Sequence, residues 1–202
     1  MCARRPTMKC SKDERRQQLL TAATDVLMEY GIQKTTLDDI ARRAGMAKTS
    51  LYYYFKEKDE IIRAIIKNDM EDLLASMRLA VEIGNTSEDK LWGLIEARYH
   101  YIATASSRAT KEVIQEFKNL SGIYAKVIEY YQKAQEELIQ DIFLQGIARG
   151  ELKPVEDVEL LALIIFSAMI GIDWTFTFNE QRELILKGLK QHMAIFFEGL
   201  RK

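Results

Sequence analysis

Residues 35–58 read TTLDDIARRAGMAKTSLYYYFKEK, and this stretch decides the fold of the first part of the chain. Thr36, with Asp39 three residues later, is a capping pattern that opens a short helix, and Gly45 stops that helix. A second short helix follows from about residue 48 to residue 55. Two short helices joined by a tight turn that contains glycine have the spacing of a helix-turn-helix. The sequence therefore predicts this motif at about residues 36–55.

The second short helix has one apolar and one polar face. On a helix with about 100° per residue, Leu51 lies at the centre of the buried face, with Ala47 and Phe55 on either side and Tyr54 at its margin. The opposite face carries hydroxyl groups and aromatic rings, on Thr49, Ser50, Tyr52 and Tyr53. Such side chains suit contacts with base edges, thymine methyl groups and phosphate oxygens. Lys48 is predicted to reach a base or the backbone, and Thr36 and Lys58 to hold phosphates.

Apolar residues recur at helical spacing along the rest of the chain, and strand patterns are almost absent. Ser11 with Glu14 caps the first helix, and Gly31 ends it. Further helices are predicted over about 58–82, 87–105, 111–120, 123–149, 156–177 and 180–200. The expected fold is all-α, with about nine helices.

The composition is that of a folded globular protein, with 48% hydrophobic and 29% charged residues among 202. The longest uncharged apolar run, residues 160–172, is shorter than the roughly 18–20 residues that a membrane-spanning helix needs. No secretory signal is recognisable, and Cys2 and Cys10 form neither a CxxC pattern nor a disulfide framework. We expect a cytoplasmic protein without a bound metal or cofactor.

Charge is distributed unevenly along the chain. Residues 1–68 contain 14 lysines and arginines and nine aspartates and glutamates, a net +5, whereas residues 69–202 contain 15 and 21, a net −6. This distribution is consistent with phosphate binding by the basic residues 1–68 and no phosphate binding by the acidic residues 69–202.

From about Arg15 to Ile66 the chain resembles the DNA-binding domain of TetR-family regulators. The matching pieces are Ala22-Ala23, Tyr30-Gly31, Thr35-Thr36, Asp39-Ile40-Ala41, Ala44-Gly45 and Leu51-Tyr52-Tyr53-Tyr54-Phe55 with Lys58. The chain departs from the family at Ala47, where a serine or threonine is common, and at Thr49, where glycine is common. These departures bear on base preference and leave the fold unaffected.

The resemblance implies a DNA-binding domain over residues 12–67 and a ligand-sensing and dimerisation domain over residues 68–202. It also implies that the helix from Lys48 to Tyr54 enters the major groove of a palindromic operator, and that Thr36 and Lys58 grip phosphates. The expected partners are operator DNA, a second copy of the chain, and a small apolar or amphipathic effector that releases the DNA.

Two further surfaces are predicted within residues 68–202. The two C-terminal helices are predicted to form a dimer interface through Leu161, Ile165, Met169, Ile185, Leu189, Met193 and Phe196. Aromatic residues of the central helices are candidates for an effector pocket, namely Trp92, Tyr99, His100, Phe117, Tyr124, Phe166 and Trp174. The charged residues Glu96 and Arg98 are expected in solvent.

Two other classes of protein compete with a regulator. An enzyme is disfavoured because the sequence has no G-x-S-x-G, H-E-x-x-H, G-x-G-x-x-G or P-loop pattern and only two histidines. The other class is a helical ligand-binding or interaction protein that has lost DNA binding. Such a protein would be expected to lose Lys48, Tyr52, Tyr53 and Lys58, and this chain keeps all four.

Overall fold

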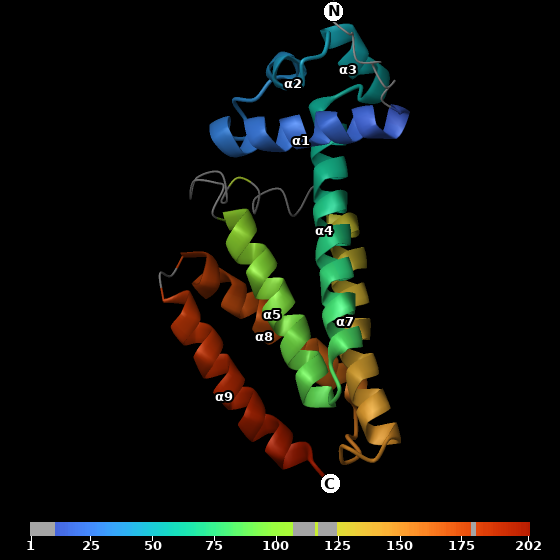
Figure 1. Cartoon of the computed structure of the whole chain (residues 1–202), viewed down its shortest axis with the longest axis vertical. Helices are drawn as coiled ribbons and strands as arrows, with labels where there is room; N and C mark the ends of the chain where they lie inside the picture. Colours follow the sequence, from blue (N-terminus) through green and yellow to red (C-terminus); the bar gives the residue numbers. More distant parts are fainter. Residues whose placement is uncertain (1–10, 107–115, 117–124, 179–180) are drawn as a thin grey trace, which may run out of the picture. The chain divides into compact units, whose positions relative to one another are not determined.

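The computed structural model describes residues 11–106, 116, 125–178 and 181–202 (Figure 1). These residues form eight helices and no strand, with one isolated bridge between Leu152 and Arg201. The all-α prediction is confirmed. The helix predicted at 111–120 lies outside the described residues, except for residue 116. None of the helices in the described ranges has both the length and the apolar character needed to cross a membrane.

The chain divides into two compact units, Met1–Ile66 with Ala109–Leu120 (unit 1) and Lys67–Arg108 with Ser121–Lys202 (unit 2). The long helix α4 (Lys58–Ile83) begins in unit 1, and its sequence continues into unit 2. The first division between the units, after Ile66, falls inside this helix.

Unit 1 contains α1 (Lys12–Tyr30), α2 (Leu37–Arg43), α3 (Lys48–Tyr54) and the start of α4. α1 packs on α2, and α2 packs on α3. The capping box predicted for the first helix is present, since the amide of Glu14 donates to Ser11 Oγ at 3.1 Å and the amide of Ser11 donates to the Glu14 carboxylate at 2.6 Å. Gly31 ends α1 with a φ of 85°, a left-handed conformation that favours glycine.

The buried face of α3 is formed by Leu51 and Phe55, which are 0% and 3% exposed. Tyr54 is half-buried, as its margin position predicts. Ala47 was predicted on the buried face, and this is wrong: it is exposed. Its φ and ψ of −68° and 145° are extended, because Ala47 is the N-cap residue. Its side chain therefore does not follow the helical period of the residues after it.

Unit 2 contains the second half of α4 with α5 (Ser87–Ser106), α7 (Ala125–Ala148), α8 (Val158–Phe178) and α9 (Arg182–Leu200). α5 packs against α7, α8 and α9, so it is the central helix of this unit (Figure 1). α7 and α8 also pack on each other. One core of buried side chains joins these helices, and its largest fully buried members are Tyr99, Phe143 and Phe197.

The ring of Phe143 holds α7 against α9. It is 0% exposed and stacks on Phe197 at a centroid distance of 6.0 Å and an interplanar angle of 4°. Its neighbour Leu144 is 46% exposed and points away from this core.

Phe143→Ala should lower the free energy of unfolding of the chain by about 3–5 kcal/mol, because it removes buried apolar surface and leaves a cavity. Leu144→Ala on the same helix is the matched control and should cost less than about 1 kcal/mol. Urea unfolding followed by circular dichroism measures both. Equal losses in the two variants would contradict the core described here.

Candidate nucleic-acid interface

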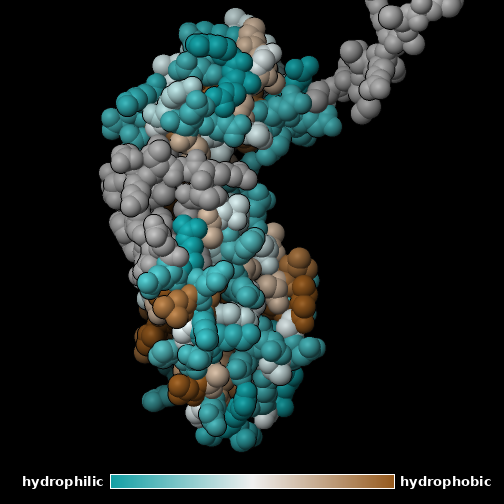
Figure 2. Space-filling model, turned by 60° about the vertical axis from the view of Figure 1, so that its left-hand side comes forward, coloured by the Kyte–Doolittle hydropathy of each residue, from teal (hydrophilic) through white to brown (hydrophobic). Residues whose placement is uncertain are grey.

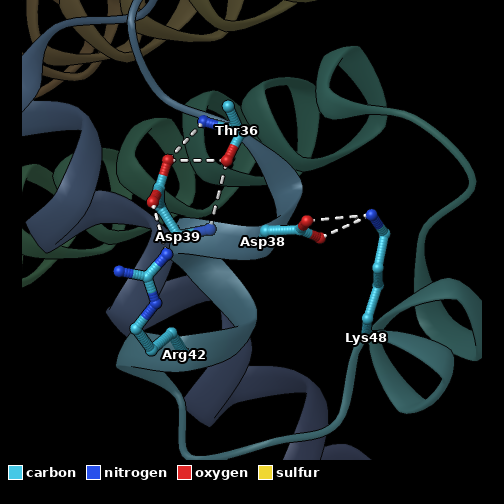
Figure 3. Close-up of polar contacts among 5 residues, drawn as sticks. All are labelled: Thr36, Asp38, Asp39, Arg42 and Lys48. Atoms are coloured by element: carbon cyan, nitrogen blue, oxygen red, sulfur yellow. Dashed lines mark hydrogen bonds and ion pairs between the residues drawn. The ribbon is translucent and has the colours of Figure 1, made fainter.

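The start of α2 is fixed by a reciprocal cap. The amide of Asp39 donates to Thr36 Oγ1 at 3.2 Å, and the Thr36 amide and hydroxyl donate to Asp39 Oδ2 at 3.1 and 2.6 Å (Figure 3). These bonds from Thr36 hold the pKa of Asp39 below its usual value. The predicted capping pattern is confirmed. The hydroxyl proton of Thr36 is already donated to Asp39, so this hydroxyl could meet a phosphate only by giving up that bond.

The outer face of α3 is exposed along its whole length. Lys48, Thr49, Ser50, Tyr52 and Tyr53 all reach solvent, and Tyr53 is 65% exposed. Lys12 Nζ lies 5.2 Å from the centre of the Tyr53 ring, a distance suited to a cation–π contact. A side chain of α1 thereby contacts the more exposed of these two tyrosine rings.

Lys48 is the first residue of α3, and its ammonium group meets the carboxylate of Asp38 in α2. The Nζ atom lies 2.8 Å from Oδ1 and 2.9 Å from Oδ2 (Figure 3). The hydrogen bond and the negative charge of Asp38 raise the pKa of Lys48 above its ordinary value. The sequence did not predict this pair, because its two residues lie ten positions apart on different helices.

Lys58 donates two of its three N–H groups to the main chain. Its Nζ atom donates to the main-chain carbonyls of Ile32 at 2.7 Å and Thr35 at 3.0 Å, and the contact is partly buried. Lys58 thereby fixes the loop between α1 and α2. That Lys58 also holds a phosphate stays a prediction.

Glu116 holds the same loop from a distant part of the sequence. Its Oε2 atom accepts the main-chain amide of Ile32 at 2.6 Å. A Cβ at Gly31 would lie 2.9 Å from this carboxylate, so the contact and the positive φ both favour glycine at position 31. Sequence reasoning missed Glu116, because no local pattern links two residues that are 84 positions apart.

The candidate effector residues lie in different environments. Trp92 and His100 line an open groove of about 990 Å³ between α4 and α5. Tyr99 and Phe166 are instead buried in the core, and the Tyr99 hydroxyl donates to the carbonyl of Met169 at 3.3 Å. Burial raises the pKa of Tyr99. Phe117 and Tyr124 lie outside the described residues, as does the side chain of Trp174.

Arg98 was expected in solvent, and this is wrong, whereas Glu96 is exposed as expected. Arg98 is 5% exposed, and its Nη2 atom lies 2.6 Å from Asp173 Oδ2. It also donates to the side chain of Gln135 and lies 5.7 Å from the centre of the Phe166 ring. A buried arginine is tolerated here because α7 and α8 supply its partners.

The residues predicted for the dimer interface mostly face their own chain. Met169 is buried, and Leu161, Ile165, Ile185, Leu189 and Met193 pack against the core of unit 2. Of the predicted set, Phe196 is exposed, at 37%. The other large apolar side chains that are exposed in the described parts of these two helices are Leu160, Leu163 and Ile164 on α8, and Leu184 and Ile195 on α9.

Comparison with known families and proteins identifies both parts of the chain. Residues 19–65 match the family described as bacterial regulatory proteins, tetR family, and residues 84–174 match the tetracyclin repressor-like C-terminal domain. The HTH-type transcriptional repressor KstR2 of Mycolicibacterium smegmatis is 30% identical over 79% of this chain and 78% of its own length.

Two further proteins are similar over most of their length. The fatty acid metabolism regulator protein of Bacillus subtilis is 26% identical over 82% of this chain and 84% of its own. The solved structure of the ketosteroid transcriptional regulator KstR2 of Mycobacterium tuberculosis is 26% identical, covers 96% of this chain and 98% of its own, and superposes with a TM-score of 0.60.

Lys58→Met should lower the free energy of unfolding by about 1.5–3 kcal/mol, because it leaves the carbonyls of Ile32 and Thr35 without their charged donor. Lys56→Met is the control, since Lys56 is exposed and donates to the single carbonyl of Tyr52. Chemical unfolding measures the loss, and salt titration of DNA binding adds a second readout. Unchanged stability with a salt slope reduced by about 0.9 per protomer would instead support the phosphate role.

Proposed function

The chain belongs to the tetR family of bacterial regulatory proteins, which makes it a ligand-responsive DNA-binding transcriptional regulator. We propose that it is a repressor that binds a palindromic operator as a homodimer and leaves it when a small molecule binds to unit 2. The single observation that carries this proposal is the exposed face of α3, where hydroxyl groups, two tyrosines and one lysine stand clear of the core.

The reading surface of this proposal consists of Lys48, Thr49, Ser50, Tyr52 and Tyr53, with Thr36 beside it at the start of α2. The α3 helix enters the major groove, where hydroxyl groups and ring edges can contact base edges and methyl groups. Capping and core contacts hold α2 and α3 in place before DNA arrives, so little conformational freedom is lost on binding. Lys58 acts behind this surface, through the loop that it anchors.

The proposed dimer surface is the exposed apolar face of α8 and α9. On α8 it follows helical spacing through Leu160, Leu163, Ile164, Ser167, Ala168 and Gly171, and on α9 it includes Leu184 and Ile195. A Cβ added at Gly171, Gly188 or Gly199 would meet no atom within 4 Å, so helices of a second copy could approach closely there. Figure 2, with the α9 side forward, shows separate hydrophobic areas on the mostly hydrophilic surface.

Dimerisation supplies the spacing that a twofold operator requires. Two α3 helices about 34–36 Å apart enter successive major grooves of an inverted repeat. An effector that favours the non-binding conformer by about 2–3 kcal/mol weakens operator binding roughly 30- to 150-fold. We propose that this change passes along α4, since its sequence runs from unit 2 into unit 1, and through Glu116, which holds the loop before α2.

An apolar or amphipathic effector is proposed from two observations. The groove between α4 and α5 exposes Trp92, Tyr101 and Ile83 alongside a few polar groups. Two similar proteins are named for fatty acid metabolism and for ketosteroids, both chemically apolar classes. We propose action in the cytoplasm and no catalytic activity.

Selection of duplex DNA by the purified protein should enrich an inverted repeat, and Tyr53→Ala or Lys48→Ala should weaken binding to that repeat by tenfold or more. Each good base contact contributes about 1–3 kcal/mol of discrimination. Tyr130→Ala is the control, because Tyr130 is 68% exposed on α7 and should leave affinity unchanged. A change within twofold in both α3 variants would exclude the assigned reading surface. No enrichment from a folded dimer would favour a ligand-binding protein without DNA recognition.

Ile195→Glu should convert the dimer into a monomer and abolish operator binding, because it places a charge in the apolar face of α9. Ile195 is 69% exposed in the single chain. Leu79→Glu on α4 is the matched control, since Leu79 is 58% exposed and lies outside the proposed interface. Light scattering after size-exclusion chromatography gives the mass of each variant. A dimeric Ile195→Glu protein would place the interface elsewhere.

A further inference from the structure

The two aspartates at the start of α2 have different roles. Asp39 completes the cap with Thr36 and also pairs with Arg42, Nη2 to Oδ1, at 3.1 Å. Asp38 takes no part in that cap. Its carboxylate instead leaves α2 and meets the ammonium group of Lys48, the first residue of α3 (Figure 3).

The pair of Asp38 and Lys48 lies at the surface. The two side chains are 52% and 54% exposed, and both carboxylate oxygens lie within 2.9 Å of Nζ. Exposed ion pairs of this kind contribute little to folding, because water screens the attraction and two long side chains lose freedom. Stability alone therefore gives no strong reason for a carboxylate at this position.

The charge of α3 depends on this pair. α3 reads KTSLYYY, so Lys48 is the one charged residue among its seven. A carboxylate less than 3 Å away cancels most of the field of that ammonium group at the distance of a phosphate. With Asp38 in place, the helix that reads DNA presents hydroxyl groups and rings and almost no net charge.

Binding to random DNA depends on such charge, whereas recognition of a sequence does not depend on it alone. Non-specific affinity comes from neutralising phosphates and releasing their counterions, one step for each free cation. A paired lysine adds little to that process. It contributes fully only where an operator offers an acceptor placed well enough to draw it from the carboxylate, such as the O6 and N7 atoms of guanine.

We infer that Asp38 is a positioning residue that limits DNA affinity: it holds Lys48 in an ion pair, which the lysine must leave before it contacts random DNA or an operator. This inference rests on the proposed function, because it assumes that α3 reads DNA. Asp38 itself touches no base in this account and acts through Lys48.

The test compares wild type with Asp38→Asn on a selected operator duplex and on a random-sequence duplex, over a series of salt concentrations. Asp38→Asn should bind random DNA about fivefold more tightly, with a salt slope steeper by about 0.9 per protomer. Operator affinity should rise by at least the same factor, because Lys48 must leave Asp38 to contact a base as well. Asp38→Glu, which keeps a carboxylate, should bind both duplexes nearly as the wild type does.

Two further variants separate the ion pair from a general charge effect. Asp25→Asn removes an exposed carboxylate of α1 whose charge acts on Arg43, and it should leave both affinities unchanged within about twofold. In a Lys48→Gln background, Asp38→Asn should no longer alter the salt slope. If the slope still steepens there, the carboxylate acts by repelling phosphate directly and the inference is overturned.

The remaining outcomes distinguish this inference from the proposed function. A wild type that selects a sequence, with an Asp38→Asn variant that binds neither duplex more tightly, would overturn the role of Asp38 alone. A folded wild type that selects no sequence would overturn the proposed function and this inference with it. Circular dichroism of each variant confirms that the helices are retained.

Discussion

The ammonium group of Lys58 satisfies the main-chain carbonyls of Ile32 and Thr35, and much of unit 1 depends on this contact. The two carbonyls lie in the short loop that joins α1 to α2, directly before the cap at Thr36. Because the loop sets where α2 begins, it also sets where α3 lies, since α3 packs on α2. Glu116 holds the same loop through the amide of Ile32. The positive charge of Lys58 thus binds two carbonyls of this loop, and the negative charge of Glu116 binds one of its amides. Gly31 gives the loop the left-handed backbone conformation that brings these groups within reach.

A comparable constraint operates inside unit 2, where the cation is an arginine. Arg98 on the central helix α5 reaches Asp173 on α8 and Gln135 on α7, so one buried guanidinium group orients three helices. Removing one partner of a buried pair leaves an uncompensated charge, which typically costs about 3–5 kcal/mol. The same three helices meet in the apolar core around Phe143 and Tyr99. Their arrangement is therefore fixed by a directional polar contact in addition to packing.

Local patterns in the sequence were sufficient for the helices of the described residues and for the buried and exposed faces of α3. The caps at Ser11 and Thr36, the stop at Gly31 and the period that buries Leu51 and Phe55 each depend on residues a few positions apart. The sequence could not predict contacts between residues that lie far apart along the chain. Lys58 looked like a free cation because its carbonyl partners are more than 20 positions away. The sequence predicted a solvent-exposed Arg98, because the partners of this residue lie on other helices. The helical period of α8 and α9 likewise did not show which apolar face of each helix packs on the chain's own core.

The composition of α3 bears on how the protein distributes itself in a cell. A chromosome offers about a million to a billion competing sites for every operator, and most copies of a strongly basic reader are held on them. A helix whose one lysine is already paired gains little from those sites. Under the proposed mode of binding, fewer molecules are then held on random sequence, and operator binding carries the same cost of breaking the pair.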